Sequence, residues 1–316
     1  MRATRVMIAA AIAVSALAAR TAHAQEAVDA GTEPEPGATA PAPAPAPAPS
    51  PETPANGTAD SATAKDEGGG LVDKTMSRSW WEGSNRFFFS TVMDAGYLYF
   101  RPRASVGYGL PFTRWVGIDA NPVVSGSGMG VYGGLRFALE HIDLRVGSRY
   151  FYAFRHAFLP PLRSLGRLDL DNVERGRATL VTHEAEINGS LPVGPGDIIA
   201  LLSVSYATGV PSDSFVFEET LKVVINPPLV WRARGGYVLK FGKYNQHSVG
   251  LVADVINVPK RDPGTTLRVG PVTRIVLSRH FEVRGSFVVP FISPDRLGLV
   301  GGDFAELGVR YRWATN

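Results

Sequence analysis

Hydrophobic and polar positions alternate along much of this chain, most regularly near its end. Over 305–313 every odd position is apolar, from Ala305 to Trp313, and the positions between them are Glu306, Gly308, Arg310 and Arg312. A β-strand points successive side chains to opposite faces, so this segment has one apolar wall and one polar wall. The same period of two recurs in 142–155, 229–241, 266–277 and 280–291. The pattern predicts an all-β fold built from two-faced strands.

Twelve segments of this kind are expected, and ten or fourteen are also compatible with the pattern. Several are longer than the typical soluble strand of about 5–6 residues, and they match the roughly 9–11 residues of a tilted membrane-spanning strand. Pro102 and Pro271 fall inside two of them, where the missing N–H would mark a bulge or an earlier strand end. The expected segments are 95–109, 113–121, 128–140, 142–155, 177–190, 197–208, 214–226, 229–241, 246–258, 266–277, 280–291 and 304–314.

The first 24 residues have the form of a secretory signal peptide. Arg2 and Arg5 form a basic start, 6–19 is an apolar run, and 22–24 reads Ala-His-Ala, a small-x-small cleavage motif. The apolar run is shorter than the roughly 18 residues that a membrane-spanning helix needs, and no later window supplies such a run. We therefore expect an exported chain whose mature form begins at Gln25.

Residues 25–70 form a second zone with a different composition. They hold nine prolines, eight acidic residues and one lysine, with almost no large apolar side chains. Such a segment cannot bury enough apolar surface to offset the entropy of ordering, so we expect a disordered, Ala/Pro-rich acidic linker in the periplasm. Residues 71–94 contain Trp80-Trp81 and three consecutive phenylalanines. They could form a helix, a plug or a further strand ahead of the main domain, 95–316.

Charge is divided at the same boundary. Of the 32 lysines and arginines, three lie in 1–24 and one lies in 25–70, which leaves 28 in the later part of the chain against 21 acidic residues. The overall net charge of +3 therefore combines an acidic linker with a basic domain. There is no cysteine, which excludes a disulfide scaffold, a thiolate metal site and a cysteine nucleophile.

Two architectures accommodate long two-faced strands. In a soluble β-sandwich the apolar wall faces a core, whereas in a transmembrane barrel it faces lipid and the polar wall faces the lumen. The export signal and the strand lengths favour the barrel, which must be closed because an open sheet edge in lipid leaves backbone groups unpaired. We therefore expect a transmembrane antiparallel up-and-down β-barrel, with a soluble all-β protein as the structural alternative.

The C-terminal segment also resembles the β-signal of bacterial outer-membrane β-barrel proteins, a porin-like superfamily. That signal reads polar, any, Gly, any, any, hydrophobic, any, hydrophobic, and it is matched by Glu306, Gly308, Tyr311 and Trp313. The common version ends on phenylalanine, whereas three further residues follow Trp313 here. The resemblance implies assembly by the barrel assembly machinery in the outer membrane of a Gram-negative bacterium.

The resemblance also implies a periplasmic C-terminus, which orients every strand. Counting the expected segments back from that end places the long stretch 156–176 on the side where turns should be short. A miscounted pair of strands would remove this conflict.

The polar wall carries the candidate functional residues. Basic side chains outnumber acidic ones there, so a confined lumen would concentrate anions, and guanidinium groups suit carboxylate and phosphate solutes. We therefore expect a small passive channel with a weak preference for small anionic solutes. The candidate lumen-lining residues are Arg136, Arg145, Arg149, Arg232, Arg234, Lys240, Arg268, Arg274, Arg284, Arg310 and Arg312, with the acids Asp143, Glu184, Glu186, Glu218, Asp254, Glu282 and Glu306.

Two other functions stay open. A non-conducting structural or surface-exposed barrel would have a lumen filled by its own paired side chains. A lipid-modifying enzyme would need a serine beside a histidine on the apolar wall. His183 lies on that wall, but its same-face neighbour along the segment is Thr179 and the pattern places no serine beside it. We therefore expect no catalytic residues and no enzymatic activity.

Other ligands have little support in the sequence. No cofactor or metal is expected, because no two histidines have i, i+4 spacing and there are no thiols. The basic residues are spread over many strands without a helix or an aromatic platform, which argues against nucleic acid. The expected partners are outer-membrane lipid, the barrel assembly machinery and small anionic solutes. The sequence pattern does not indicate an oligomeric state.

Overall fold

The computed structural model describes residues 83–96, 99–171, 176–304 and 308–315. The expected signal peptide and linker lie outside these residues. Within the described part of the chain, no helix is long and apolar enough to cross a membrane.

Thirteen strands form one sheet, and a separate hairpin of two short strands lies in the loop between β7 and β10. The sheet strands are β1 (Arg86–Gly96), β2 (Tyr99–Leu110), β3 (Arg114–Ser125), β4 (Gly128–Ala138), β5 (Ile142–Ala157), β6 (Arg177–Val193), β7 (Gly196–Thr208), β10 (Leu229–Phe241), β11 (His247–Asn257), β12 (Thr265–Val276), β13 (Phe281–Ser286), β14 (Val289–Ile292) and β15 (Gly308–Ala314). The short elements are η1 (Arg167–Asp171), β8 (Val216–Glu218), β9 (Val223–Ile225) and η3 (Gly298–Gly301).

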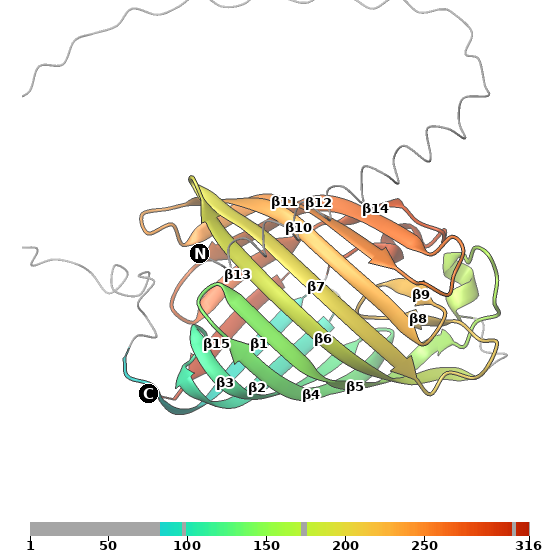
Figure 1. Ribbon diagram of the computed structural model, residues 1–316, viewed down its shortest axis with the longest axis horizontal. Helices are drawn as coiled ribbons and strands as arrows, with labels where there is room; N and C mark the ends of the chain where they lie inside the picture. The colour runs from blue at the N-terminus through green and yellow to red at the C-terminus, as the bar shows by residue number, and fades with distance from the viewer. Residues whose placement is uncertain (1–82, 97–98, 172–175, 305–307, 316) are drawn as a thin grey trace, which may run out of the picture. The chain divides into compact units, whose positions relative to one another are not determined.

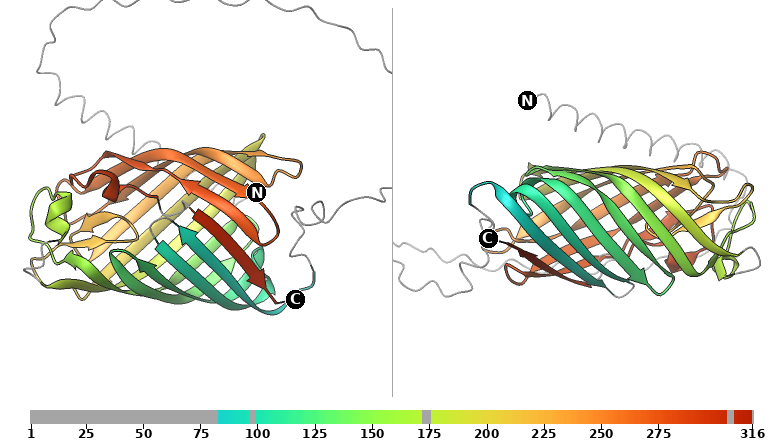
Figure 2. Two further views of the ribbon diagram at one scale, coloured as in Figure 1. Left: turned by 180° about the vertical axis from the view of Figure 1, so that it is seen from behind. Right: turned by 90° about the horizontal axis from the view of Figure 1, so that it is seen from below.

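The sheet closes on itself. Each strand pairs antiparallel with its neighbour in the sheet. β15 pairs with β1 and β11 pairs with β12, and these pairings join the sheet into a closed barrel. β13 and β14 are consecutive pieces that both pair with β12, so the thirteen strands fill twelve positions around the barrel. Figures 1 and 2 show the strands wound obliquely around the barrel axis. The expectation of a closed antiparallel barrel of about twelve strands is confirmed.

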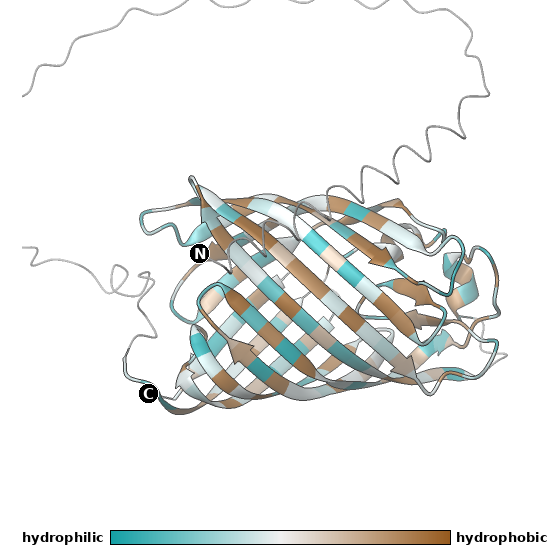
Figure 3. Ribbon diagram, in the orientation of Figure 1, coloured by the Kyte–Doolittle hydropathy of each residue, from teal (hydrophilic) through white to brown (hydrophobic). Residues whose placement is uncertain are grey.

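Along most strands, hydropathy alternates between the two walls, as Figure 3 shows. The outer wall exposes a dense set of apolar side chains, for example Val106, Ile118 and Leu135 at 58%, 60% and 65% exposure. Exposed aromatic residues gather toward the two ends of the strands, as in the girdles of membrane barrels. They include Phe87, Tyr108, Phe137, Phe241 and Phe281 near one end and Phe100, Tyr150, Phe154, Tyr206 and Phe291 near the other.

The two ends of the barrel differ in their connections. At the turn end, where β1 begins and β15 ends, the strands are joined by the short segments 111–113, 139–141, 194–195, 242–246 and 277–280. At the loop end they are joined by the short segments 97–98 and 126–127 and by the long loops 158–176, 209–228, 258–264 and 293–307. Short turns at one end and long loops at the other are typical of outer-membrane barrels.

One of the twelve expected segments was wrong, and the strand alternative for 71–94 offsets it in the strand count. The segment 214–226 is not a barrel strand, because it forms the β8–β9 hairpin. The described part of 71–94 supplies β1, so the barrel begins at Arg86 and not at residue 95. With β1 added and 214–226 removed, every strand between them in the sequence runs in the direction opposite to the expected one. The stretch 156–176 therefore lies at the loop end, which removes the conflict in the count.

The two prolines expected inside strands, Pro102 and Pro271, lie at breaks in the hydrogen-bonded ladder. The β2–β3 register would pair Pro102 with Pro122. The two strands are not paired at this position, which lies between the pairs Phe100↔Val124 and Ala104↔Ala120. Pro271 lies opposite the gap between β13 and β14, where it accepts a hydrogen bond from the Phe287 N–H but has none to donate. In a sheet without edges, a proline interrupts pairing because it lacks a donor.

Glycine allows close packing at one place on the inner wall. The Tyr132 side chain is buried over the cross-strand pair Gly134 and Gly147, with the Arg145 guanidinium 4.9 Å from its ring centre. A Cβ on Gly134 would overlap the Tyr132 hydroxyl and the Val146 carbonyl oxygen. A Cβ on its neighbour Gly133, which faces outward, would have nothing within 4 Å.

We therefore expect Gly134→Ala to lower the free energy of unfolding by about 1–3 kcal/mol, because side chain and backbone must shift to make room. Gly133→Ala is the matched control and should leave stability unchanged or slightly raised. Both can be measured from the temperature at which the folded barrel loses its compact gel mobility. Equal effects of the two substitutions would contradict the packing argument.

Candidate functional site

The inner wall carries the basic residues proposed from the sequence. Each of these eleven residues lies within 4.0 Å of a carboxylate, so they form ion pairs along the inner wall. The pairs are Arg136 with Asp119 and Asp143, Arg145 with Glu184 and Glu186, Arg149 with Glu184 and Glu218, Arg232 and Arg234 with Asp254 and Asp303, Lys240 with Asp197, Arg268 with Asp254, Arg274, Arg284 and Arg312 with Glu282, and Arg310 with Asp94 and Glu282.

Two carboxylates, Glu282 and Asp254, contact more basic side chains than the other carboxylates of this set. Glu282, on β13, is fully buried, with the Nε atoms of Arg274 and Arg284 at 2.8 and 2.7 Å. Asp254, on β11, is also fully buried and receives Arg232 Nε at 2.6 Å and Arg234 Nη2 at 3.0 Å. One carboxylate can pair with several guanidinium groups at once. Each of these clusters therefore keeps a net positive charge although its arginines have a negative partner.

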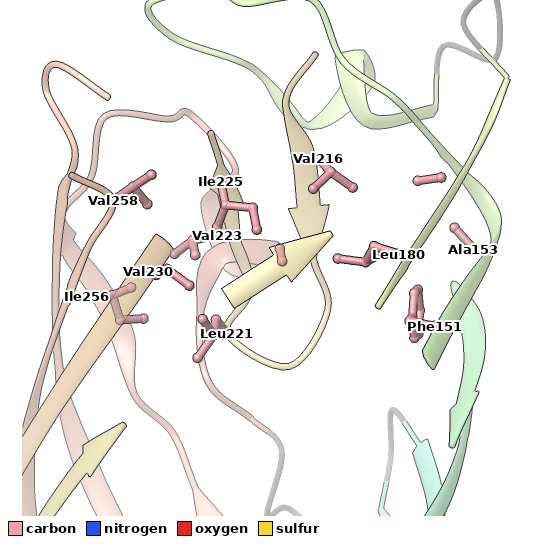
Figure 4. Packing of buried hydrophobic residues seen from close by; sticks show 12 residues of the cluster. Phe151, Ala153, Leu180, Val216, Leu221, Val223, Ile225, Val230, Ile256 and Val258 are labelled. Carbon is pink, nitrogen blue, oxygen red and sulfur yellow. The ribbon is translucent and has the colours of Figure 1, made fainter. Parts of the chain in front are cut away.

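The loop end of the lumen is filled by the β8–β9 hairpin. We call residues 209–228, which include this hairpin, the cap. Its Val216, Leu221, Val223 and Ile225 pack against inward-facing side chains of β5, β6, β7, β10 and β11, as Figure 4 shows. The wall residues of this core are Phe151, Ala153, Ala178, Leu180, Ala207, Val230 and Ile256, together with Val258 just beyond β11.

Polar contacts also hold the cap to the wall. The fully buried Arg268 of β12 donates to the carbonyl oxygens of Leu221 and Lys222, and Arg149 of β5 donates to Thr220. Outside the hairpin, a second apolar cluster packs Leu159, Leu165, Leu170 and Leu297 from the other long loops on Phe215, Phe217 and Val224. The loop end is therefore closed by folded polypeptide with its own core.

Two neighbouring carboxyl groups of the cap have opposite pKa shifts. Burial raises the pKa of Glu218 above its ordinary value, against the charge of Arg149. Burial would also raise the pKa of Glu219, but contacts with His156 and Lys222 lower it to about 2. Lys222 Nζ lies 2.6 Å from Glu219 Oε2, and His156 Nδ1 lies 2.8 Å from Oε1. Glu219 therefore contributes to holding the cap only while it is ionised.

This contribution depends on pH with a definite sign. Because the pKa of Glu219 falls from about 4.5 to about 2 on folding, its stabilisation is complete above the higher value and lost as the pH falls through the lower one. We expect hydrogen-exchange protection of 215–226 to decrease between pH 4.5 and 2, after correction for intrinsic rates, and more in the natural chain than in Glu219→Gln. An identical profile in the variant would contradict this role.

The turn end of the lumen is hollow. A cavity of about 930 Å³, which we call the vestibule, is lined by residues of the turns 111–113, 139–141 and 242–246 and by the adjoining inner wall. Its volume is in the range of about 300–1,000 Å³ that small-molecule sites occupy. Its charged lining consists of Arg103, Arg114, Arg136, Lys240, Arg274, Arg284, Arg310 and Arg312 against Glu140, Asp143 and Asp197.

Arg103, on β2, differs from the other basic residues of the vestibule. Among the described residues no carboxylate lies within ion-pair distance of it, and its Nε is buried without a hydrogen-bond partner. The neighbouring charges that act on it are mainly those of Arg136, Arg101 and Arg310, with Asp119 opposing them. A partly buried cation among other cations is an unbalanced charge that an anion can neutralise.

Four residues of the inner wall and its ion pairs were not expected from the sequence: Arg103, Asp94, Asp119 and Asp303. A signal for Arg103 was present, because Arg101, Arg103 and Ser105 alternate with Pro102, Ala104 and Val106. Asp303 lies after the 3₁₀ helix η3 in a loop, and its contact with Arg232 and Arg234 has no periodic signal. Six of the seven proposed acidic residues take part in the ion pairs, whereas Glu306 lies outside the described residues. The six are Asp143, Glu184, Glu186, Glu218, Asp254 and Glu282.

Two further sequence expectations can be placed. Gly308, Tyr311 and Trp313 of the proposed assembly signal lie on β15, which pairs with β1 and closes the barrel. Among the described residues, no group of three or more histidine, aspartate or glutamate side chains is arranged to hold a metal ion.

Comparisons with known proteins add little to this geometry. No protein-family model matches the sequence, and no curated protein matches it. Among solved structures, the chain is similar to the NanC porin, with 10% identity over 72% of this chain and 98% of that one and a TM-score of 0.34. Because this similarity is weak, we infer nothing from it about individual residues or solutes. The fold conclusion therefore comes from the geometry itself: this is a closed antiparallel β-barrel with an apolar outer wall and a charged, half-filled lumen.

Proposed function

We propose that the chain is an outer-membrane β-barrel that passes small anionic solutes through a basic lumen, and that the cap closes the lumen in the state described. The observation that carries the proposal is the vestibule, with eight basic and three acidic side chains around about 930 Å³. The apolar walls around such a space focus its potential and raise the local concentration of anions.

The location of the barrel is part of this proposal. The apolar outer wall and the two aromatic girdles support insertion in a bilayer, and the signal-peptide pattern supports export, with the turn end on the periplasmic side. Cell fractionation tests it: the mature chain should need detergent for extraction and should change gel mobility on heating. A stable monomer recovered from periplasmic extract without detergent would overturn it.

The channel itself is tested by planar-bilayer recording with the full mature chain in a salt gradient. We expect rare openings, because the cap fills the loop end, with a reversal potential displaced toward that of the anion. Cation preference would overturn the proposal. The complete absence of current, in this chain and in a variant without the cap, would also overturn it.

Arg103 provides the sharpest test of selectivity. Arg103→Gln should lower the anion-to-cation permeability ratio roughly twofold by removing the unbalanced charge from the vestibule. Stability should stay unchanged or rise, since no described carboxylate loses its partner. Arg136→Gln is the control for a paired arginine, because it leaves the buried Asp119 without its ion pair and should lower stability as well. The reversal potential and the thermal midpoint separate the two effects.

A second candidate is a non-conducting barrel whose lumen is filled by its own side chains. The apolar core of the cap and the pairing of the lumen arginines favour it. In this case, removing the cap would lower stability without creating an anion-selective current. The same recordings therefore decide between the two functions.

A further inference from the structure

A polar pair lies on the apolar outer wall of the barrel. Ser148 of β5 and His183 of β6 are direct partners in the antiparallel register, and Ser148 Oγ lies 2.8 Å from His183 Nδ1. Both side chains face outward, between Val146 and Tyr150 on one strand and between Val181 and Ala185 on the other. A serine and a histidine in this position are surrounded by side chains suited to lipid.

The geometry of the pair is that of a nucleophile and a general base. A serine hydroxyl becomes a nucleophile when an imidazole nitrogen within about 2.6–3.2 Å can accept its proton. His183 can take this part with the proton on Nε2 and the lone pair of Nδ1 directed at the hydroxyl. Among the described residues, Nε2 has no hydrogen-bond partner, so it remains open to water or substrate at the membrane surface.

Next to the pair, a row of small residues crosses the outer wall. The row of cross-strand partners through Ser148 continues on one side as Gly133, Ala120 and Ala104, all with small side chains or none. The adjacent row, Val146, Leu135, Ile118 and Val106, is strongly exposed and forms a ridge beside it. The space at Gly133 is open, since an added Cβ would meet nothing within 4 Å. An acyl chain can lie in this groove with its carbonyl end at Ser148.

The position of the Ser148–His183 pair along the membrane normal also matches that of a lipid ester bond. Tyr206 is the β7 partner of His183, Tyr150 is the next outward residue after Ser148, and both are about half exposed near the loop end. Exposed tyrosines mark the boundary between hydrocarbon and headgroups. Ester bonds of membrane lipids lie at the same boundary, so the serine is at the level of the bond it would attack.

We propose that Ser148 and His183 form an acyl-transfer site that cleaves the ester of an amphiphilic lipid lying against the outer wall near the loop end. This inference depends on the membrane placement proposed above and is independent of whether the lumen conducts.

The reaction balances without an additional reagent. Ser148 Oγ bonds to the ester carbonyl carbon while its proton passes to His183 Nδ1. The bond from that carbon to the alkoxy oxygen then breaks, and the same proton passes from His183 to the leaving oxygen. Water subsequently attacks the acyl-serine with His183 again as the base, which releases the fatty acid and restores the hydroxyl. Among the described residues the hydrogen-bond partner of the His183 ring is Ser148 and not a carboxylate. The lack of an orienting carboxylate costs about 10⁴ in a serine–histidine–aspartate site, so turnover should be slow.

A serine-reactive fluorophosphonate tests the pair in the full mature chain in detergent, with mass spectrometry to locate the label. We expect labelling at Ser148, its loss in Ser148→Ala, and a decrease of about 10²-fold in His183→Gln, which keeps a hydrogen-bonding side chain but removes the base. Thr91→Ala, which changes an outward polar residue on β1 in the same row, is the control and should label like the natural chain.

Fatty-acid release from mixed micelles of phosphatidylglycerol and detergent tests the substrate class. Gly133→Leu should block it by filling the groove, while labelling by the small fluorophosphonate persists. Gel mobility without heating shows that each variant is folded. Equal labelling of Ser148→Ala and the natural chain, or no labelling and no release from a folded natural chain, would overturn the inference. Both results are independent of conductance and leave the channel proposal unaffected.

Discussion

Replacing residues 211–227 with a four-residue glycine–serine linker should raise the bilayer conductance of the barrel roughly tenfold or more and retain its anion preference. The cap is the part of the chain that fills the loop-end half of the lumen, and its apolar core is built against the wall. The wall does not need the cap for its pairing, because β7 and β10 meet directly from Tyr206↔Leu229 onward. A short linker can therefore join the two strands.

The shortened barrel should also be less stable. Phe151, Leu180, Val230 and Ile256 lose their apolar partners and face water in the lumen, at a cost of about 1.5–3 kcal/mol for each fully exposed side chain. The register of the strands and the outer wall stay as they are, so the variant should still show heat-modifiable mobility. A folded, cap-less barrel without current would contradict the channel and favour the filled barrel.

A chain with the cap intact but loosened gives an independent check. Arg268→Lys keeps a positive charge in the lumen but removes the planar guanidinium whose Nη2 donates to both the Leu221 and the Lys222 carbonyl oxygens. We expect more frequent openings at an unchanged single-channel conductance and unchanged anion preference. Openings as rare as in the natural chain would show that the apolar core alone holds the cap.

Strand positions were largely predictable because lipid and lumen impose opposite demands on the two walls. The sequences 229–241 and 280–291 carry this period of two and became β10 and β13–β14. The cap was read wrongly as a strand because it also is rich in β-branched and aromatic residues. Its apolar positions, however, are consecutive: Val216 and Phe217, then Val223, Val224 and Ile225, all buried. A run that is apolar on both faces indicates a segment enclosed by protein and not a membrane strand.

The candidate sites depended on register, which a single sequence does not contain. His183 was placed correctly on the apolar wall, but its partner Ser148 lies 35 residues away on the neighbouring strand. Shifting the pairing of β5 and β6 by one residue would place the two side chains on opposite walls. The same holds for Glu282, whose four arginine neighbours come from β12, β13 and β15.

The second large effect is expected at that carboxylate. Glu282→Gln should lower the free energy of unfolding by about 3–5 kcal/mol, because it removes the negative partner from arginines that stay buried together. Arg274 and Arg312 have no other described carboxylate within ion-pair distance, whereas Arg310 keeps Asp94. Water in the vestibule reaches Arg274, whose side chain is 40% exposed, so a value near the lower limit is expected. The thermal midpoint of the unheated gel band measures the loss.

Selectivity distinguishes this carboxylate from a simple structural support. The substitution adds one net positive charge beside the vestibule, so the anion-to-cation permeability ratio should rise while stability falls. Asp143→Asn is the matched control: it removes one carboxylate from the vestibule lining, yet Arg136 keeps Asp119, so selectivity should rise with a stability loss of only about 0–1 kcal/mol. If Glu282→Gln is destabilised but shows an unchanged reversal potential, the arginines act as struts and the vestibule is not on a conducting path.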